Sequence, residues 1–114
     1  MAGVKTLINT TSATLQITLF GRAGSNPVNQ GAATNVTLLP NQTLTVQYGD
    51  DANPFLNGIS VFAIADNDLY SKVQFVLATG SELDNVLNTN NVLVFSKVLT
   101  DYLVTGVNSP FFPS

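Results

Sequence analysis

Apolar and polar residues alternate along most of the chain, and this period of two predicts β-strands. The clearest case is the segment 14–20, where Leu15, Ile17 and Leu19 share one face and polar residues occupy the other. No segment shows a long helical repeat. We therefore predict strands at residues 4–9, 14–20, 35–39, 42–48, 59–65, 70–78, 92–96 and 99–104.

Two of these strands carry expectations about burial. The segment 59–65 is apolar at nearly every position, which is typical of a central strand buried on both faces. In the segment 70–78, we expect Val73, Phe75 and Leu77 to face the core.

The segments between strands contain recognisable turn signals. Pro40 and Asn41 suit the two central positions of a turn, so we predict that 35–39 and 42–48 form a hairpin. Residues 21–34 are predicted to be a long polar loop, interrupted by a short edge strand around 27–29. Residues 81–84 have the spacing of a capping box, which is compatible with one helical turn through 85–87 or with a plain loop.

The number and spacing of the strands predict the fold class. At 114 residues the chain has the size of one domain, residues 1–114. About eight short strands separated by turns predict an all-β fold, an antiparallel β-sandwich of about 7–8 strands that is immunoglobulin-like or jelly-roll-like. A small barrel is the alternative topology.

One segment resembles a known family. Residues 35–46 read Asn-Val-Thr-Leu-Leu-Pro-Asn-Gln-Thr-Leu-Thr-Val. This resembles a hairpin of bacterial immunoglobulin-like accessory β-sandwich modules, which carry the pattern hydrophobic-x-Leu-x-Pro-Gly-x-x-x-x-Val. Asn41 stands where that family usually has glycine. The resemblance covers about a tenth of the chain, and it implies a non-enzymatic module used for adhesion or spacing.

Composition narrows the function classes. Only 10% of the residues are charged, and 13 Asn and 13 Thr supply much of the polar surface of this acidic chain of net charge −3. The four basic residues are scattered, so we expect no nucleic-acid partner. No apolar run approaches the ~20 residues that would span a bilayer. The first residues lack the apolar region of a signal peptide, which predicts a cytoplasmic protein or one exported by a signal-less route.

The absence of Cys and His excludes several catalytic chemistries. The cysteine-free chain has no thiolate nucleophile or sulfur-ligated metal, and without histidine a Ser-His-Asp triad cannot form. The remaining carboxylates are Glu82 and six Asp, nearly all in turn-like contexts. We therefore expect the protein not to be an enzyme and to need no cofactor, apart from the calcium considered next.

Acidic residues are concentrated in two loops at opposite ends of the predicted strand 59–65. Such loops supply the oxygen ligands that calcium prefers, and the candidate ligands are Asp50, Asp51, Asp66 and Asp68. A strand of seven residues is about 23 Å long, so the two loops of one chain cannot share an ion. The competing interpretation is that Asp and Asn are simply the residues that turns favour.

Aromatic residues flank the same loops and suggest a carbohydrate-binding, lectin-like module as an alternative function, although the chain has no Trp to serve as a platform. Sugar sites commonly combine polar hydrogen-bonding groups with such an aromatic platform. The candidate ligand-binding residues are Tyr48, Asp50, Asp51, Asn53, Phe55, Asp66, Asn67, Asp68 and Tyr70.

The C-terminal segment Pro110, Phe111, Phe112 and Pro113 places two adjacent aromatic side chains near the chain end. They must either cap the core of their own chain or pack on another subunit. Low charge also weakens the usual protection of sheet edges against pairing. The leading hypothesis is therefore a structural or interaction module that forms a homo-oligomer, or binds another protein, through a sheet edge or this tail.

Overall fold

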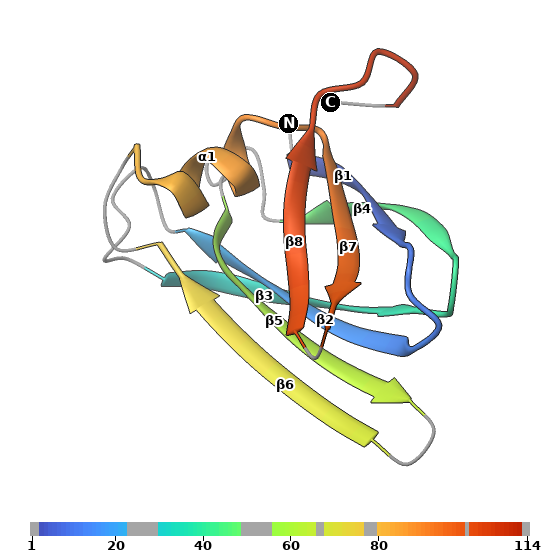
Figure 1. Cartoon of the computed structure of the whole chain (residues 1–114). Coiled ribbons are helices and arrows are strands. Elements are labelled where there is room, and N and C mark those ends of the chain that lie inside the picture. Colours follow the sequence, from blue (N-terminus) through green and yellow to red (C-terminus); the bar gives the residue numbers. More distant parts are fainter. Residues whose placement is uncertain are drawn as a thin grey trace.

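The computed structural model describes residues 3–22, 30–48, 56–65, 68–76, 80–99 and 101–112. Over these residues the chain forms eight strands and one short helix (Figure 1). In chain order they are β1 (Gly3–Asn9), β2 (Thr14–Arg22), β3 (Gln30–Leu38), β4 (Thr43–Tyr48), β5 (Leu56–Ala65), β6 (Asp68–Phe75), α1 (Glu82–Asn88), β7 (Val92–Val98) and β8 (Asp101–Val107).

The strands form two sheets of four, in the orders β4-β1-β7-β8 and β3-β2-β5-β6, so the predicted all-β sandwich is confirmed. Neighbouring strands run antiparallel with one exception: β1 and β7 are parallel, with Leu7 beside Leu93. Parallel neighbours need a long connection. Here the chain between β1 and β7 builds the whole opposite sheet, β4 and α1 before it returns.

The core lies between the two sheets and follows the alternation seen in the sequence. Leu15, Ile17 and Leu19 of β2 are almost completely buried, and the residues between them are half-buried or exposed. Leu7 of β1 and Phe95 of β7 oppose them from the other sheet in the same buried cluster. Period-two patterning was therefore sufficient to identify the inner face of β2.

A helix, and not a plain loop, follows β6. The hydroxyl of Ser81 accepts a hydrogen bond from the Asp84 N–H at 3.3 Å, as an N-cap does, and α1 then continues through Asn88. The helix is longer than the single predicted turn, because Leu87 is buried in the core and anchors its far end.

The predicted hairpin around Pro40 and Asn41 is wrong, although the turn itself is present. Asn41 has φ 60°, and the Gln42 N–H donates to the Leu39 carbonyl at 3.1 Å, as the proline and the following asparagine favour. However, β3 pairs with β2 and β4 pairs with β1, so this turn crosses between the sheets. Turn residues select a local geometry and do not specify which strands will pair.

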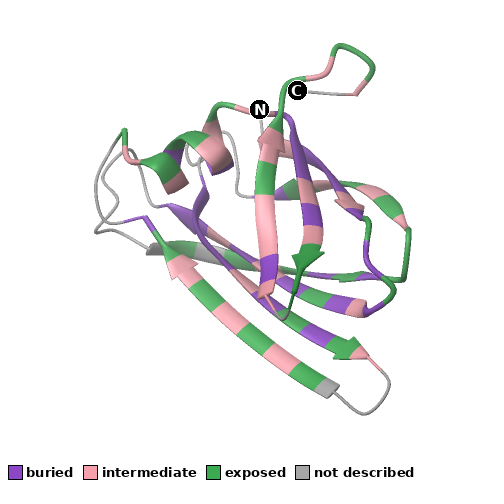
Figure 2. Cartoon of the chain, in the orientation of Figure 1, coloured by how far each residue is buried: buried purple, intermediate pink, exposed green. Residues whose placement is uncertain are grey.

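Two expectations about burial are also wrong. Phe62 and Ile64 of β5 are exposed, because no described element covers the outer face of this sheet (Figure 2). On β6, Val73 and Phe75 lie on that outer face, whereas Tyr70 lies on the inner side against Tyr102, with ring centroids 4.9 Å apart. Leu77 falls outside the described residues.

The predicted loop 21–34 is shorter than expected. Gly21 and Arg22 continue β2, and β3 begins at Gln30. Residues 23–29, which include the predicted edge strand 27–29, lie outside the described part of the chain.

Candidate functional site

The most distinctive surface of the molecule is apolar and lies on the β5–β6 hairpin. We call it the β5–β6 outer face. Its side chains are between 38% and 68% exposed, and they are Phe62, Ile64, Leu69, Val73 and Phe75. Soluble proteins bear scattered apolar side chains routinely, but a contiguous group of this kind commonly marks an interaction site.

The strand register shows that these side chains share one face. Ile64 lies opposite Leu69, and the next outward positions along the two strands alternate with them at a period of two. At the far end, Phe75 lies opposite Gly58 and contacts Phe20 of β2 with ring centroids 5.0 Å apart. A Cβ on Gly58 would stand 2.6 Å from the Phe75 ring, so glycine allows this aromatic pair to close over the strand between them.

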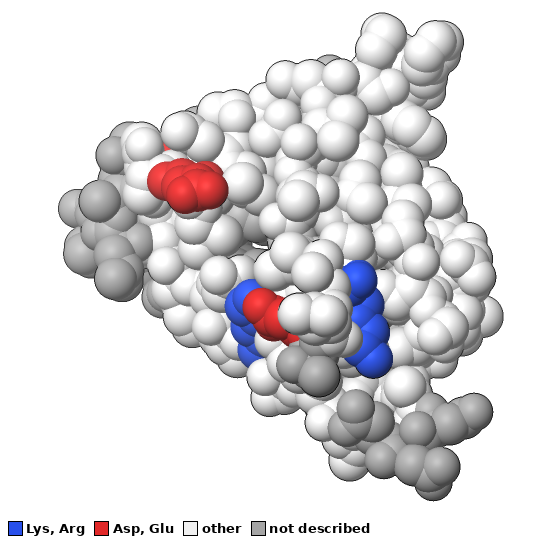
Figure 3. All heavy atoms as spheres, viewed as in Figure 1, with Lys and Arg blue, Asp and Glu red and all other residues white. Residues whose placement is uncertain are grey.

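The described outward positions of β5 and β6 carry no charged side chain. Figure 3, viewed with β8 in front, shows small groups of charged atoms on a side of the molecule that is otherwise uncharged. Lys72 lies on the inner side of β6, and its ammonium contacts the Asp101 carboxylate of β8 at 3.4 Å. The Tyr70 hydroxyl donates to the same carboxylate. The hydrogen bond from Tyr70 and the charge of Lys72 hold the pKa of Asp101 below its usual value.

The C-terminal segment leaves one of its two aromatic rings in solvent. Phe111 is 91% exposed, whereas Phe112 is half-buried. The segment is held by Asn91, whose amide donates to the carbonyls of Ser109 at 2.7 Å and Phe112 at 3.0 Å. Pro110 is exposed beside them, and Pro113 lies outside the described residues. Phe111 therefore does not cap the core of its own chain.

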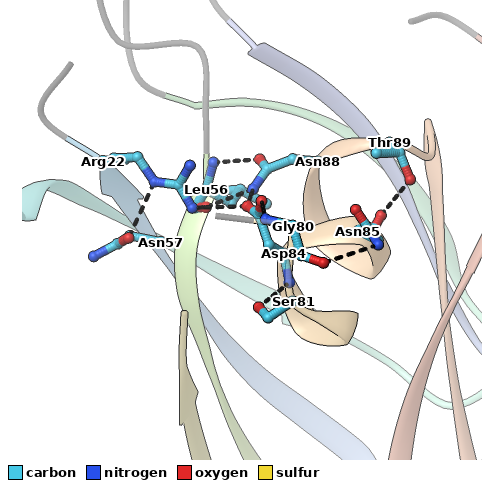
Figure 4. A network of polar contacts seen from close by, with 9 residues as sticks. All are labelled: Arg22, Leu56, Asn57, Gly80, Ser81, Asp84, Asn85, Asn88 and Thr89. Carbon is cyan, nitrogen blue, oxygen red and sulfur yellow. Dashed lines mark hydrogen bonds and ion pairs between the residues drawn. The ribbon is translucent and has the colours of Figure 1, made fainter. Parts of the chain in front are cut away.

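A buried polar network joins α1 to the β3-β2-β5-β6 sheet (Figure 4). The Arg22 guanidinium contacts the Asp84 carboxylate at 2.8 Å, and their side chains are only 4% and 11% exposed. Arg22 also donates to the Asn57 side chain at 3.1 Å and to the Leu56 carbonyl at 3.2 Å. The Asn88 amide donates to the same Asp84 oxygen at 2.8 Å.

Opposing effects act on the acidity of Asp84. Burial raises its pKa, but the Gly80 N–H, the Arg22 guanidinium and the Asn88 amide together outweigh burial and lower it below the usual value. The carboxylate is therefore charged at neutral pH and fully engaged with protein groups. This arrangement fixes the helix on the sheet and offers no free acid or base.

Sequence reasoning missed this network. Arg22 and Asp84 are 62 residues apart in the chain. In the sequence, Arg22 is one of four scattered basic residues and nothing near it indicates a partner. A local signal was present, since Asp84 occupies the last position of the capping box. Its side chain reaches back to the Gly80 N–H at 2.9 Å and also turns inward to Arg22.

Lys5 is a second buried charge that the sequence analysis did not single out. Its ammonium donates to the Asn90 carbonyl, and burial lowers its pKa to about 8. The unfolded chain keeps the proton up to about pH 10.4, so the free energy of unfolding should rise as the pH increases from 8 to 10. Above that range Tyr48, whose pKa burial raises to about 12, reverses the trend.

Replacing Lys5 by methionine should raise the free energy of unfolding at pH 7 by about 1–2 kcal/mol. This gain in the free energy of unfolding is smaller than the full pKa shift implies, because the Asn90 carbonyl and nearby solvent still stabilise the Lys5 ammonium. Urea unfolding at pH 7, 8, 9 and 10 tests the prediction. The wild-type curve should rise with pH while the variant curve stays flat, and parallel curves would contradict it.

Two of the predicted ligand-binding aromatics have described side chains, and the fold separates them. Tyr48 is 5% exposed at the end of β4, opposite Gly3. Tyr70 packs on Tyr102, and its hydroxyl is bonded to Asp101 at the opposite end of the β4-β1-β7-β8 sheet. Neither ring therefore presents an open platform to a sugar.

Of the other predicted ligand residues, only Asp68 lies within the described part of the chain. Asp68 begins β6 opposite Ala65. The rest lie outside the described residues, and they are Asp50, Asp51, Asn53, Phe55, Asp66 and Asn67. Within the described ranges, no three acidic side chains gather as a cation site would require. The calcium and carbohydrate hypotheses stay predictions from sequence.

Comparison of the chain with protein-family models, with curated proteins and with solved structures gives no match. No helix in the described part of the chain is long and apolar enough to cross a membrane.

Proposed function

We propose that this protein is a non-enzymatic structural or interaction module that associates with further copies of itself. The observation that carries the proposal is the β5–β6 outer face, where large apolar side chains remain in solvent although the rest of the sandwich has a well-buried core. Covering apolar surface is the main favourable term in protein association.

The size of this surface is appropriate for the centre of an interface. Its five side chains expose on the order of 400 Å² in total. A stable interface buries about 800 Å² per partner, with an apolar centre and a polar rim. The neutral side chains Gln16 and Ser71 flank Phe62 on the adjoining strands and can form part of such a rim.

The acidic residues support the non-enzymatic part of the proposal. Among the described acidic side chains, Asp84 and Asp101 are held in ion pairs and are not free for a catalytic role, whereas the exposed Glu82 on the first turn of α1 belongs to no group of three acidic side chains. General acid–base catalysis needs a group that is free to exchange a proton with a substrate. The whole chain contains neither His nor Cys to take that role.

We expect a defined oligomer of at least two chains, with the same native mass in calcium and in chelator. Multi-angle light scattering after size-exclusion chromatography measures this mass. A monomer in both buffers at high micromolar concentration would contradict the proposal. A mass that falls only in chelator would instead assign the contact to the Asp-rich loops.

The variant Phe111→Ser separates the contribution of the tail from that of the sheet. The Phe111 ring is almost fully exposed, so removing it should leave folding unchanged. If the tail contributes to association, the native mass of this variant will fall at low protein concentration. An unchanged native mass would show that the tail does not contribute and would assign the contact to the β5–β6 outer face.

A further inference from the structure

Strand β6 lies at the edge of its sheet, where no other described strand pairs with its outer side, and the direction of its backbone groups can be deduced. The Val76 N–H donates to the Asn57 carbonyl at 2.8 Å, in continuation of the regular β5–β6 register. Hydrogen-bonded and non-bonded pairs alternate along an antiparallel ladder. The even-numbered residues of β6 therefore direct their N–H and C=O groups toward β5, and Leu69, Ser71, Val73 and Phe75 direct theirs away from the sheet.

This edge lacks most of the features that usually prevent strands from pairing. Proteins protect edges with short strands, bulges, prolines, charges on the edge or charges that point inward from it. Strand β6 is eight residues long, keeps an unbroken register with β5 and contains no proline. Among its described side chains the one charge is the inward-pointing Lys72, and this charge is paired within its own chain, with Asp101 and the Tyr102 carbonyl. The outward side chains Leu69 and Val73 are 68% and 54% exposed.

The edge strands β3 and β4 are different. Their exposed alternate positions are small or polar, and they are Gly31, Ala33, Asn35 and Thr37 on β3 and Thr43, Thr45 and Gln47 on β4. On the fourth edge strand, β8, the corresponding exposed positions are Thr105 and Val107 at one end of the strand. Of the four described edges, β6 combines outward backbone groups with three large apolar side chains among its four exposed alternate positions, Leu69, Val73 and Phe75, with Ser71 between the first two.

We propose that β6 pairs antiparallel with β6 of a second copy around a two-fold axis, so that two four-stranded sheets become one of eight strands. This inference deepens the proposed self-association and rests on it. A two-fold axis at Lys72 places Leu69 of one copy opposite Phe75 of the other and Ser71 opposite Val73. All outward backbone groups of the four residues then find partners, and the two β5–β6 outer faces merge into one apolar strip.

The charges at the axis are compatible with this pairing. Two copies of Lys72 meet there on the inner side of the joined sheet, and each already has an Asp101 carboxylate within 3.5 Å. Two cations and two anions therefore gather at the axis, and the carboxylates offset the repulsion that two lysines directly opposite each other would cause. The second copy is thus the partner that the edge fits by shape, backbone and charge.

The test introduces a charge on the edge, as Val73→Lys. The Val73 side chain is exposed, so the monomer should keep its fold, which circular dichroism and thermal unfolding will verify. The matched control Thr37→Lys adds the same charge at an exposed position of β3, on the outer face of the same sheet. Sedimentation velocity over a concentration series should show at least 100-fold weaker dimerisation for Val73→Lys and no change for Thr37→Lys.

Amide hydrogen exchange provides a readout that is specific to strand pairing. In the dimer, the amides of Leu69, Ser71, Val73 and Phe75 should be protected, and protection should be lost on dilution or in Val73→Lys. The amides of Tyr70, Lys72 and Gln74 face β5 and should stay protected in every sample. Contact through side chains alone would leave the outward amides unprotected, and this result would overturn the inference.

The outcomes separate the inference from the proposed function. An oligomer that persists in Val73→Lys with unprotected outward amides overturns β6 pairing while self-association stands, and Phe111→Ser then tests the tail. A wild-type monomer at all concentrations overturns both, and leaves strand addition by an extended segment of another protein as the candidate use of this edge.

Discussion

Replacing Asp84 by alanine is expected to lower the free energy of unfolding by about 3–5 kcal/mol. The change leaves the Arg22 guanidinium without its carboxylate in a site where the side chain is 4% exposed. It also removes the acceptor of the Gly80 N–H and the Asn88 amide. Guanidinium denaturation at pH 7 measures the loss as a shift of the midpoint at constant slope.

The partly exposed ion pair of Lys72 and Asp101 is the control for this prediction. Asp101→Asn should lower the free energy of unfolding much less than Asp84→Ala does, because solvent screens the charges of a partly exposed pair. An Asp84→Ala variant that loses no more stability than Asp101→Asn would contradict the structural importance of the buried pair. The double variant Arg22→Met with Asp84→Leu should recover much of the loss, because no unpaired charge then remains buried.

The lowered pKa of Asp84 gives the same pair a defined pH dependence. A carboxyl group whose pKa is lower in the folded protein contributes stability above its unfolded pKa of about 3.9. That contribution disappears as the pH falls further, through the lower folded value. Acid unfolding of the wild type should therefore be steeper below pH 4 than that of the double variant Arg22→Met with Asp84→Leu.

The second large effect is expected for Asn9→Leu, which should lower the free energy of unfolding by about 3 kcal/mol. Asn9 is 1% exposed at the end of β1. Its amide donates to the carbonyls of Ala13 at 2.9 Å and Leu39 at 3.0 Å, and its oxygen accepts from the N–H and hydroxyl of Thr11. One side chain thus connects two of the turns that cross between the sheets, at residues 10–13 and 39–42, and leucine leaves their buried polar groups without partners.

Asn35→Ala is the matched control for Asn9. Asn35 is exposed on β3, and its oxygen accepts one hydrogen bond from the Thr18 hydroxyl at 2.8 Å. Its replacement should change stability by less than about 0.5 kcal/mol. Equal losses in the free energy of unfolding at the two positions would show that the Asn9 contacts do not stabilise these turns between the sheets.

Local features of this protein were predictable from sequence because they depend on neighbouring residues. The alternation in β2 and the apolar run in β5 located strands, since burial of one face selects a period of two. Ser81 made the start of a helix one of the two alternatives at this position, because its hydroxyl needs only the Asp84 N–H three residues away. Pro40 and Asn41 predicted their turn for the same reason.

The candidate surfaces were predictable only in part. The sequence indicated that a sheet edge or the tail would be exposed, because the chain has few charges to protect an edge and two adjacent Phe near its end. It could not indicate which edge, since Val73 and Phe75 were expected to face the core. In β6 the alternation places the large apolar residues on one face, but the fold turns that face outward and packs Tyr70 of the other face against Tyr102.

Sequence by itself therefore determined the all-β class, the approximate positions of the strands and the turn at Pro40. Only the tertiary structure decided that β3 and β4 belong to different sheets, that β6 turns Tyr70 inward to Asp101, and that Arg22 meets Asp84. The physical reason is distance along the chain. Strand pairing and buried charge contacts join segments that are far apart in sequence, and the free energy that selects them depends on the whole packed core.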